Sequence, residues 1–286
     1  MPDAGLAILP SETRFPFPNP DSRFPIMSEQ YLDLSGTDAV RVLTITRPDK
    51  LNALNRATIA ALHARFDALA ADPALRVLII TGAGPKAFIA GADISEFEGL
   101  TAETAAAYAR QGQAMLDRLE SLPVPTIAAI NGYALGGGCE LALACTFRLV
   151  ADTARIGLPE TSLGLIPGFG GTQRLGRAIG RQQALDMILT GRQVGADEAV
   201  RLGFALRAVP AAQLMDDAQA LAAQLAIRAP LALRYAREAL AEGLDRPLVD
   251  GLAVEARLFG LAAATGDMAE GVRAFLEKRQ ASFTGR

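Results

Sequence analysis

Hydrophobic and polar positions follow two different periods along this chain, and the period changes from one segment to the next. Residues 30–46 alternate between apolar and polar side chains and are rich in Val, Ile and Thr, with a glycine turn at residues 36–38. Alternation of this kind predicts a β-hairpin. In residues 56–71 the apolar side chains recur every three or four positions, which predicts a helix.

Strand and helix signals continue to alternate in the segments that follow. An apolar run over residues 76–82 predicts a buried strand, and residues 86–90 predict a shorter one. A glycine turn then leads to an expected helix start at Asp93, and peptide N–H groups in this turn could face a ligand. A long helix is expected over about residues 101–120, and a further strand over residues 147–151.

The second part of the chain has helical spacing almost throughout. This spacing begins at residue 172, with one short strand expected near residues 203–209. The C-terminal residues predict three or four helices, separated by breaks at Pro230, Pro247 and Gly266. The order of elements therefore predicts an α/β core followed by a helical C-terminal part.

One stretch, residues 126–145, combines a strand, a glycine-rich turn and a helix. Its three consecutive glycines, Gly136 to Gly138, allow the backbone to pass close to another group because they carry no Cβ atom. At the N-terminus of a helix the peptide N–H groups have no partner within the helix and point outward together. The stretch therefore predicts a site for a negatively charged oxygen, with Glu140 about one turn further on as a candidate acid or base.

A second segment, residues 156–172, is too rich in Gly and Pro for regular structure and too apolar for an exposed loop. It is expected to line a pocket, and Glu160 is its only charged residue. Burial and mutual repulsion can separate the pKa values of Glu140 and Glu160, so that one carboxyl serves as a base and the other as an acid. Each also has an ordinary interpretation, because Glu140 suits a helix dipole and Glu160 suits a solvent-exposed turn.

Composition narrows the class of protein. The chain has 286 residues, half of them hydrophobic and 21% charged, so it can form one large domain or one domain with an appendage. The formal net charge is -3 and the basic residues are scattered, which argues against nucleic acid as a partner. No apolar run is long enough for a membrane span. Residues 1–26 are rich in Pro and Phe without periodicity, and a disordered extension is expected there.

Few residues are available for metal or disulfide chemistry. Cys139 and Cys145 are six positions apart on one predicted helix and point to different faces, so they cannot pair, and a reducing cytoplasm is the expected location. His63, the single histidine, is expected on the surface of its helix. No metal and no cofactor are therefore expected. The glycines at residues 136–138 lack the G-x-G-x-x-G spacing, which argues against a dinucleotide site.

Five longer motifs are more specific than any of these signals. They are residues 51–54, 90–94, 131–141, 159–175 and 274–279. With them the chain resembles the crotonase (enoyl-CoA hydratase/isomerase) superfamily along nearly all of residues 30–284. The resemblance implies a crotonase-like spiral of ββα units over residues 27–210 and a helical C-terminal trimerisation part over residues 211–286. It also implies an acyl-CoA thioester substrate, and a homotrimer or a hexamer built as a dimer of trimers.

The same resemblance implies roles for individual residues. The main-chain N–H groups of Ala92 and Gly137 would form an oxyanion hole, and Glu140 and Glu160 would be the catalytic pair. Members with both acids resemble hydratases, whereas many isomerases, dehalogenases and hydrolases of the superfamily keep one or neither. The implied reaction is reversible addition of water to a trans-2-enoyl-CoA, as in the β-oxidation of fatty acids. Glu140 would activate the water, and Glu160 would donate the proton that ends on Cα.

Other residues would hold the substrate and its coenzyme A moiety. By resemblance they are Lys50, Leu51, Ala90, Gly91, Asp93, Ile94, Gly136 and, from a neighbouring subunit, Phe275 and Lys278. An ordinary solvated loop lysine is the alternative interpretation of Lys50. For Phe275 and Lys278 the alternative is simple placement on an amphipathic helix.

Three other functions stay open at this point. One is a Δ3,Δ2-enoyl-CoA isomerase or another crotonase-fold activity on an acyl-CoA. The second is a serine peptidase of the same spiral type, which needs a histidine beside a serine, and His63 lies in no recognisable peptidase motif. The third is a non-catalytic RNA-binding or scaffold member, against which the net charge and the two glutamates argue.

Overall fold

The computed structural model describes residues 31–286, and the extension expected over residues 1–26 lies outside this range. The strands form two sheets. The larger sheet has the order β1-β2-β3-β5-β7-β10 and the smaller one the order β4-β6-β8-β9. The strands are β1 Leu32–Gly36, β2 Val40–Ile45, β3 Val77–Gly82, β4 Ala87–Ile89, β5 Thr126–Ile130, β6 Tyr133–Leu135, β7 Phe147–Ala151, β8 Arg155–Gly157, β9 Val194–Gly195 and β10 Arg207–Val209.

The first two strands form the predicted hairpin, and most of the remaining pairs are parallel. β1 pairs antiparallel with β2, whereas β2, β3, β5, β7 and β10 pair in parallel. In the smaller sheet β4, β6 and β8 are parallel and the short β9 closes the edge antiparallel to β8. Two neighbouring parallel strands must be joined by a long crossover connection. Further strands and helices therefore lie in the chain between one parallel strand and the next.

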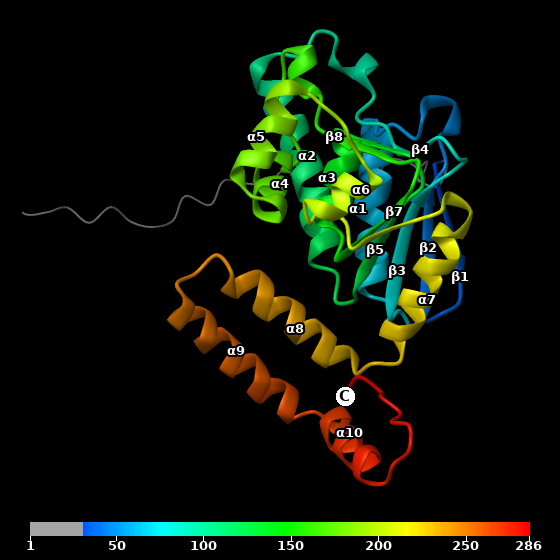
Figure 1. The fold of residues 1–286 in the computed structure, drawn as a ribbon, viewed down its shortest axis with the longest axis vertical. Helices are drawn as coiled ribbons and strands as arrows, with labels where there is room; N and C mark the ends of the chain where they lie inside the picture. The colour runs from blue at the N-terminus through cyan, green and yellow to red at the C-terminus, as the bar shows by residue number, and fades with distance from the viewer. Residues whose placement is uncertain (1–30) are drawn as a thin grey trace, which may run out of the picture.

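Those crossovers follow one repeating order. A strand of the larger sheet is followed by a strand of the smaller sheet and then by a helix, as in β3-β4-α2, β5-β6-α3 and β7-β8-α4. Each repeat places its two strands beside those of the previous repeat. The chain therefore winds as a spiral of ββα units (Figure 1), which confirms the fold class expected from the sequence.

The helices begin and end where the local sequence provides caps and breaks. Asn55 caps α1 by accepting a hydrogen bond from the Thr58 N–H, and Thr101 and Thr104 form a reciprocal capping box at the start of α2. The helices are α1 Arg56–Ala70, α2 Ala102–Glu120, α3 Gly137–Ala144, α4 Gly171–Ile179, α5 Arg181–Thr190, α6 Ala196–Arg201, α7 Leu214–Ala226, α8 Pro230–Gly243, α9 Leu248–Ala263 and α10 Gly266–Leu276. Short 3-10 turns are η1 Pro48–Lys50, η2 Ile94–Phe97, η3 Glu160–Leu163 and η4 Ala211–Gln213.

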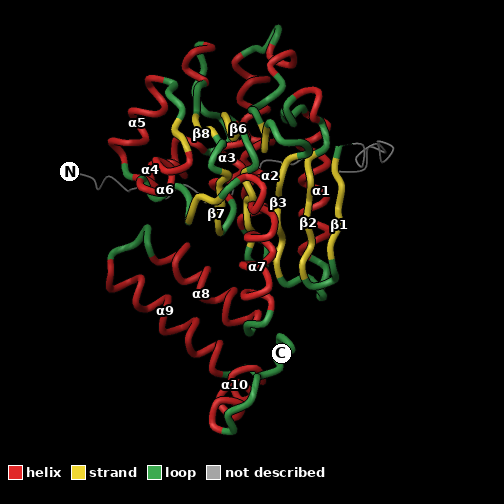
Figure 2. Tube along the Cα trace, turned by 45° about the vertical axis from the view of Figure 1, so that its right-hand side comes forward, coloured by secondary structure: helices red, strands yellow, loops and turns green. Residues whose placement is uncertain are grey.

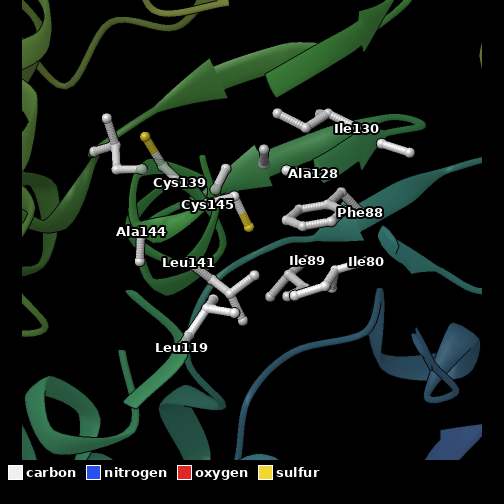
Figure 3. Close-up of a cluster of buried hydrophobic side chains, with 14 of the residues drawn as sticks. Ile80, Phe88, Ile89, Leu119, Ala128, Ile130, Cys139, Leu141, Ala144 and Cys145 are labelled. Atoms are coloured by element: carbon white, nitrogen blue, oxygen red, sulfur yellow. The ribbon is translucent and has the colours of Figure 1, made fainter. Parts of the chain in front are cut away.

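The core of the molecule surrounds the short helix α3. Every residue of α3 and of the neighbouring strands β3 and β5 is buried. Figure 3 shows Leu141 of α3 among Leu119 of α2, Ile89 of β4 and Ile80 of β3. A charged side chain on a helix surrounded in this way needs partners, because an unpaired buried charge is costly. Glu140 is the one charged residue of α3.

The last three helices lie apart from this core (Figures 1 and 2). α7 packs against strands of the larger sheet, whereas α8 and α9 pack mainly against each other. Arg237 of α8 ties this pair to the core, because its guanidinium donates to the Leu122 and Val124 carbonyls just beyond α2, at 2.9 and 2.8 Å. The predicted breaks are confirmed, since Pro230 and Gly266 begin α8 and α10. The domain division after residue 210 stays a prediction.

The expectation of irregular structure over residues 156–172 is wrong in part. The segment contains the end of β8 and the turn η3, and α4 begins at Gly171. β6 was not expected either, and it occupies three residues between Asn131 and the glycine turn. Both strands are three residues long, so the sequence shows no alternation, and their pairing with each other and with β4 and β9 defines them.

Three further expectations concern the two cysteines, the single histidine and the possibility of a membrane-spanning helix. Cys139 and Cys145 are both buried and free, as predicted. His63 lies on α1 with its side chain 42% exposed and 3.8 Å from Asp67, which confirms the surface position. Within residues 31–286, none of the helices has the length and apolar character needed to cross a membrane.

Candidate active site

Two glycine turns lie side by side, one after β4 and one after β6. Because β4 and β6 are parallel neighbours, their carboxyl ends lie at the same edge of the smaller sheet. Gly91 has φ +119° and Gly136 has φ +48° with ψ −123°. Residues with a side chain rarely adopt these angles. The turns direct Ala92 and Gly137 to the same cavity.

Both residues that follow the turns keep an N–H group without a protein acceptor. Ala92 forms a parallel bridge with Leu54, in which the Leu54 N–H donates to the Gly91 carbonyl and the Asp93 N–H donates to the Leu54 carbonyl. This pattern leaves the Ala92 N–H outside the bridge. Gly137 is the first residue of α3, so its N–H has no partner within the helix. In the described part of the chain neither group donates to another residue.

The three consecutive glycines have different physical roles. Gly136 is required by its backbone angles. Gly138 is required by packing, because a Cβ atom there would lie 2.0 Å from the Ile89 carbonyl oxygen. α3 can therefore approach β4 only through a glycine. A Cβ atom on Gly137 would make ordinary contacts at 3.4 Å and beyond, so its N–H is the part of this residue that matters for the site.

Glu140 is buried one turn into α3, and its carboxyl oxygens differ in their contacts. Oε1 accepts hydrogen bonds from the Phe169 N–H and the Gly171 N–H, each at 2.8 Å. Oε2 makes no hydrogen bond to residues 31–286. Burial raises the pKa of Glu140 to about 7; the charge of Glu160 also raises it, whereas the two N–H groups and Arg174 lower it. The carboxyl is thus poised to exchange a proton near neutral pH.

Glu160 begins η3 on the other side of the glycine turn. A Cβ atom on Gly136 would lie 3.0 Å from Oε1 of Glu160, so this carboxyl reaches the turn that precedes Gly137. Its Oε2 is buried and has no hydrogen-bond partner among the described residues. Burial raises the pKa of Glu160 as well. A protonated carboxyl at this position could donate a proton into the cavity.

A single cavity of about 630 Å³ joins these groups. It contains both glutamates and both glycine turns, and its remaining wall comes from η2, α2 and the segment after η3. The apolar part of the wall is formed by Ile94, Phe97, Leu100, Ala105, Ala109, Leu163, Leu165, Ile166 and Phe169. A second cavity of about 520 Å³ adjoins it and shares several of these residues. The arrangement suits a flexible apolar chain that ends in a reactive polar group.

The other residues expected to bind the substrate lie in four places. Ala90, Gly91, Ile94 and Gly136 line the cavity. Leu51 with Lys50, Asp93, and Phe275 with Lys278 are the other three groups. Among the described residues, none of these three groups is part of the cavity wall.

Leu51 lies beside the first turn, because its carbonyl accepts from the Ala90 N–H at 3.0 Å, and Lys50 precedes it on the exposed surface. Asp93 faces away from the cavity and pairs with Arg47 at 2.9 Å. Phe275 lies in the last turn of α10 and Lys278 two residues beyond the end of that helix, and Phe275 is 82% exposed. In Figure 1, α10 lies well apart from α3, the helix that carries Glu140. Contact between the α10 residues and a neighbouring subunit's substrate stays a prediction.

Sequence reasoning missed the groups that surround Glu140. The N–H donors of Phe169 and Gly171 come from a segment about thirty positions further along the chain. Tyr108 of α2 was also missed; it lines the cavity with a buried hydroxyl that has no hydrogen-bond partner among residues 31–286. The density of glycines at residues 168–171 was the available signal, since glycine permits a close approach of main-chain N–H groups.

The chemistry that these groups can perform follows from their types. Two unpaired N–H groups facing a largely apolar cavity can stabilise an oxygen that gains negative charge during a reaction. Two carboxyls whose pKa values are raised by burial can take and give protons. Within residues 31–286 no group of three or more His, Cys, Asp or Glu side chains is placed to hold a metal ion.

Comparison with known proteins shows the family of this chain. The family model described as enoyl-CoA hydratase/isomerase matches residues 35–286. Crotonyl-CoA hydratase of Syntrophomonas wolfei is 41% identical over 260 residues, covering 91% of this chain and 100% of that protein. Short-chain-enoyl-CoA hydratase of Clostridium acetobutylicum is 40% identical over 241 residues, covering 84% and 92%.

Solved structures give the same result for the fold. The crystal structure of an enoyl-CoA hydratase from Bacillus anthracis matches with a TM-score of 0.87 at 40% identity, covering 90% of this chain and 100% of that one. The likeness thus extends through the sequence and the fold. This protein belongs to the enoyl-CoA hydratase/isomerase family of the crotonase superfamily.

Proposed function

We propose that the protein is an enoyl-CoA hydratase, which adds water reversibly to a trans-2-enoyl-CoA and gives a 3-hydroxyacyl-CoA. The observation that carries the proposal is the convergence of Glu140, Glu160 and the N–H groups of Ala92 and Gly137 on one cavity. Related proteins named crotonyl-CoA hydratase and short-chain-enoyl-CoA hydratase support it. The reaction is a step of the type found in fatty-acid β-oxidation, and a cytoplasmic location suits the two free cysteines.

The thioester carbonyl oxygen would lie between the N–H groups of Ala92 and Gly137. Addition of water at Cβ places negative charge on this oxygen, and the two fixed donors stabilise it. Glu140 in its ionised form accepts a proton from the attacking water through Oε2. The other carboxyl oxygen, Oε1, already accepts two main-chain hydrogen bonds. Glu160 in its protonated form donates to Cα. The net result is one O–H group on Cβ and one hydrogen on Cα, with both carboxyls able to recover their starting forms.

The rest of the substrate would occupy the surfaces beside these groups. The acyl chain fits the apolar wall between η2, α2 and the segment after η3. The coenzyme A moiety would lie over Lys50, Leu51 and the turn at residues 90–94, with Phe275 and Lys278 supplied by a neighbouring subunit. The proposed steps use side chains and main-chain N–H groups of this chain and require no cofactor.

Crotonyl-CoA is the substrate that tests the proposal most directly. We expect the purified protein to remove the ultraviolet absorbance of the conjugated enoyl thioester, with 3-hydroxybutyryl-CoA as the product identified by chromatography. No loss of absorbance at micromolar enzyme would reject a hydratase. Shift of a double bond in a 3-enoyl-CoA, without hydration, would favour the isomerase alternative. Full activity of His63→Ala would dispose of a histidine-dependent peptidase mechanism.

We also propose that the chain assembles as a homotrimer or a dimer of trimers through its helical C-terminal part, over residues 211–286. Large apolar side chains of α8, α9 and the loop between them are exposed in a single chain, including Leu244, Leu248 and Phe259, each at least 75% exposed. Exposed apolar side chains gathered in this way mark interaction surfaces. Burial of each such side chain contributes roughly 1.5–3 kcal/mol.

Charge introduced into this surface should prevent assembly. Three or six chains of 30.0 kDa give a particle of about 90 or 180 kDa. We expect the wild type at one of these masses by sedimentation or light scattering, and Leu248→Asp at a smaller mass or as a monomer. Leu189→Asp, at an exposed leucine of α5, is the matched control and should keep the wild-type mass. A wild-type monomer would contradict the proposed assembly.

A further inference from the structure

The segment that donates two N–H groups to Glu140 is itself held by side chains of α2 and α4, one of which, Gln113, also lines the cavity. Gln113 of α2 donates through Nε2 to the Gly168 carbonyl at 2.9 Å. Arg174 of α4 donates through Nη1 to the Phe169 carbonyl at 3.1 Å. The two carbonyls belong to the segment whose N–H groups at Phe169 and Gly171 bind Oε1 of Glu140.

One peptide unit connects Gln113 directly to Glu140. The Gly168 carbonyl and the Phe169 N–H belong to the same planar, trans peptide group, so they point in opposite directions. The carbonyl accepts from Gln113 on one side, and the N–H donates to Oε1 of Glu140 on the other. A hydrogen bond to the carbonyl also polarises the N–H and strengthens its own hydrogen bond. Gln113 therefore fixes both the direction and the strength of this donor.

Arg174 is fixed in turn by two acids on the same face of α2. Its Nη2 atom lies 2.7 Å from Oδ1 of Asp117 and 2.7 Å from Oε2 of Glu120. Residues 113, 117 and 120 are four and three positions apart, so they share one face of the helix. We name Gln113, Asp117, Glu120 and Arg174 the α2–α4 clamp.

Two glycines show how closely the clamp fits the segment. A Cβ atom on Gly170 would lie 2.4 Å from Nη1 of Arg174, and Gly170 has φ +105°. On the α2 side, a Cβ atom on Gly112 would lie 2.1 Å from the ring of Phe169. The ring and the main chain of Phe169 are thus both packed against α2. Rotation of the segment would move the Phe169 ring and the Arg174 guanidinium out of these close contacts.

We propose that Gln113 and Arg174 are positioning residues for Glu140, holding two N–H donors on Oε1 so that Oε2 is left for the reacting water. The proposal rests on the proposed hydratase function. The two donors and the Arg174 charge favour the ionised carboxylate, against burial and the charge of Glu160. Tyr108 of α2 lines the same cavity, and Cys139 of α3 is buried in the core close enough for the charges of both glutamates to affect it; burial keeps both groups neutral by raising the pKa of each.

The test is the pH dependence of kcat/KM in Gln113→Met and Arg174→Ala. Methionine matches the length of glutamine without an N–H donor. With weaker donors the ionised form of Glu140 is less stable, its pKa rises, and more of the enzyme is protonated at pH 7. We expect the acidic limb of the profile to move to higher pH by about half a unit to one unit, with kcat/KM recovering at alkaline pH. Arg174→Lys, which keeps the charge, should shift less than Arg174→Ala.

Matched controls lie on the same two helices. Gln111→Met changes an exposed glutamine of α2 outside the cavity wall, and Arg177→Ala removes an exposed arginine of α4 that pairs with Asp245. Both variants should keep the acidic limb of the wild-type pH profile of kcat/KM. An equal loss of kcat/KM at every pH, or a wild-type profile in Gln113→Met, would overturn the proposal. A rise in KM alone would also overturn it, because that result would make Gln113 a substrate contact.

A second measurement does not depend on the reaction. Infrared difference spectra between acidic and neutral pH, with Glu140→Gln as the reference, report protonation of the Glu140 carboxyl in the free protein. Gln113→Met should raise the midpoint of this titration relative to Gln111→Met. A shifted midpoint in a protein that fails to hydrate crotonyl-CoA would reject the hydratase function and keep the clamp. An unshifted midpoint in an active hydratase would reject the clamp alone. If Arg174→Ala does not fold, the pH profile and the infrared titration of Gln113→Met decide whether the proposal holds.

Discussion

Glu140→Gln is expected to lower kcat for hydration of crotonyl-CoA by roughly a hundredfold to ten-thousandfold, the usual contribution of a positioned acid or base. Glutamine cannot accept the proton of the attacking water at neutral pH. The affinity for a saturated ester such as butyryl-CoA, measured by calorimetry, should stay close to the wild-type value. Glu160→Gln should lose activity to a similar degree, because its amide cannot supply the proton that ends on Cα.

The substitution at residue 140 should leave the fold intact. The side-chain oxygen of glutamine can still accept both N–H groups that Oε1 of Glu140 accepts at 2.8 Å. Burial raises the pKa of Glu140 from 4.5 to about 7, so the folded state binds the proton more tightly than the unfolded chain does. Its contribution to stability is therefore full below pH 4.5 and is lost as the pH rises to about 7. Glu140→Gln should remove this part of the pH dependence of unfolding.

A matched control separates the effect of removing a negative charge from the effect of removing a group that transfers a proton. Glu103→Gln changes an exposed acid in the first turn of α2 outside the cavity wall, and it should keep wild-type kcat. Wild-type kcat in Glu140→Gln or in Glu160→Gln would contradict the proposed roles. A large loss of butyryl-CoA affinity would instead assign that glutamate to substrate binding.

Local patterns in the sequence were enough to predict the elements that depend on local physics. The hairpin of β1 and β2 follows from alternation around a glycine turn, and α1 and α2 follow from helical spacing behind capping residues. β6 and β8 could not be found in this way. Each has three residues, and each exists because it pairs with the other and with a further strand of the smaller sheet.

The candidate active site likewise combines features that the local sequence predicts with contacts between segments that are distant in the sequence. Three glycines before an acid predicted a donor site at the start of α3, and both glutamates were selected as candidate acids. The sequence could not distinguish Gly136, which is needed for its backbone angles, from Gly138, which is needed for contact with Ile89. Nor could it show that the partners of Glu140 come from Phe169 and Gly171, because that contact depends on how α4 packs beside α3.

Gly136→Ala tests the oxyanion hole through the backbone. At φ +48° and ψ −123° an alanine is strained by about 1–3 kcal/mol, and its Cβ atom would lie 3.0 Å from Oε1 of Glu160. The Glu160 carboxyl can move aside, but the backbone strain is relieved by rotation of the turn, and rotation takes the Gly137 N–H away from the thioester oxygen. We expect kcat for crotonyl-CoA hydration to fall by about 10²–10³-fold, the typical effect of losing one such donor.

The control for Gly136→Ala is Gly176→Ala, at a glycine inside α4 where a Cβ atom would meet nothing within 4 Å. This second alanine should keep wild-type kcat and raise stability by up to about 1 kcal/mol, since alanine favours a helix more than glycine does. Urea unfolding of both variants shows whether strain at residue 136 has merely reduced the folded fraction. A folded Gly136→Ala protein with wild-type kcat would mean that the Gly137 N–H does not hold the oxygen. The developing charge would then need a different donor, such as the Ala92 N–H, which faces the same cavity.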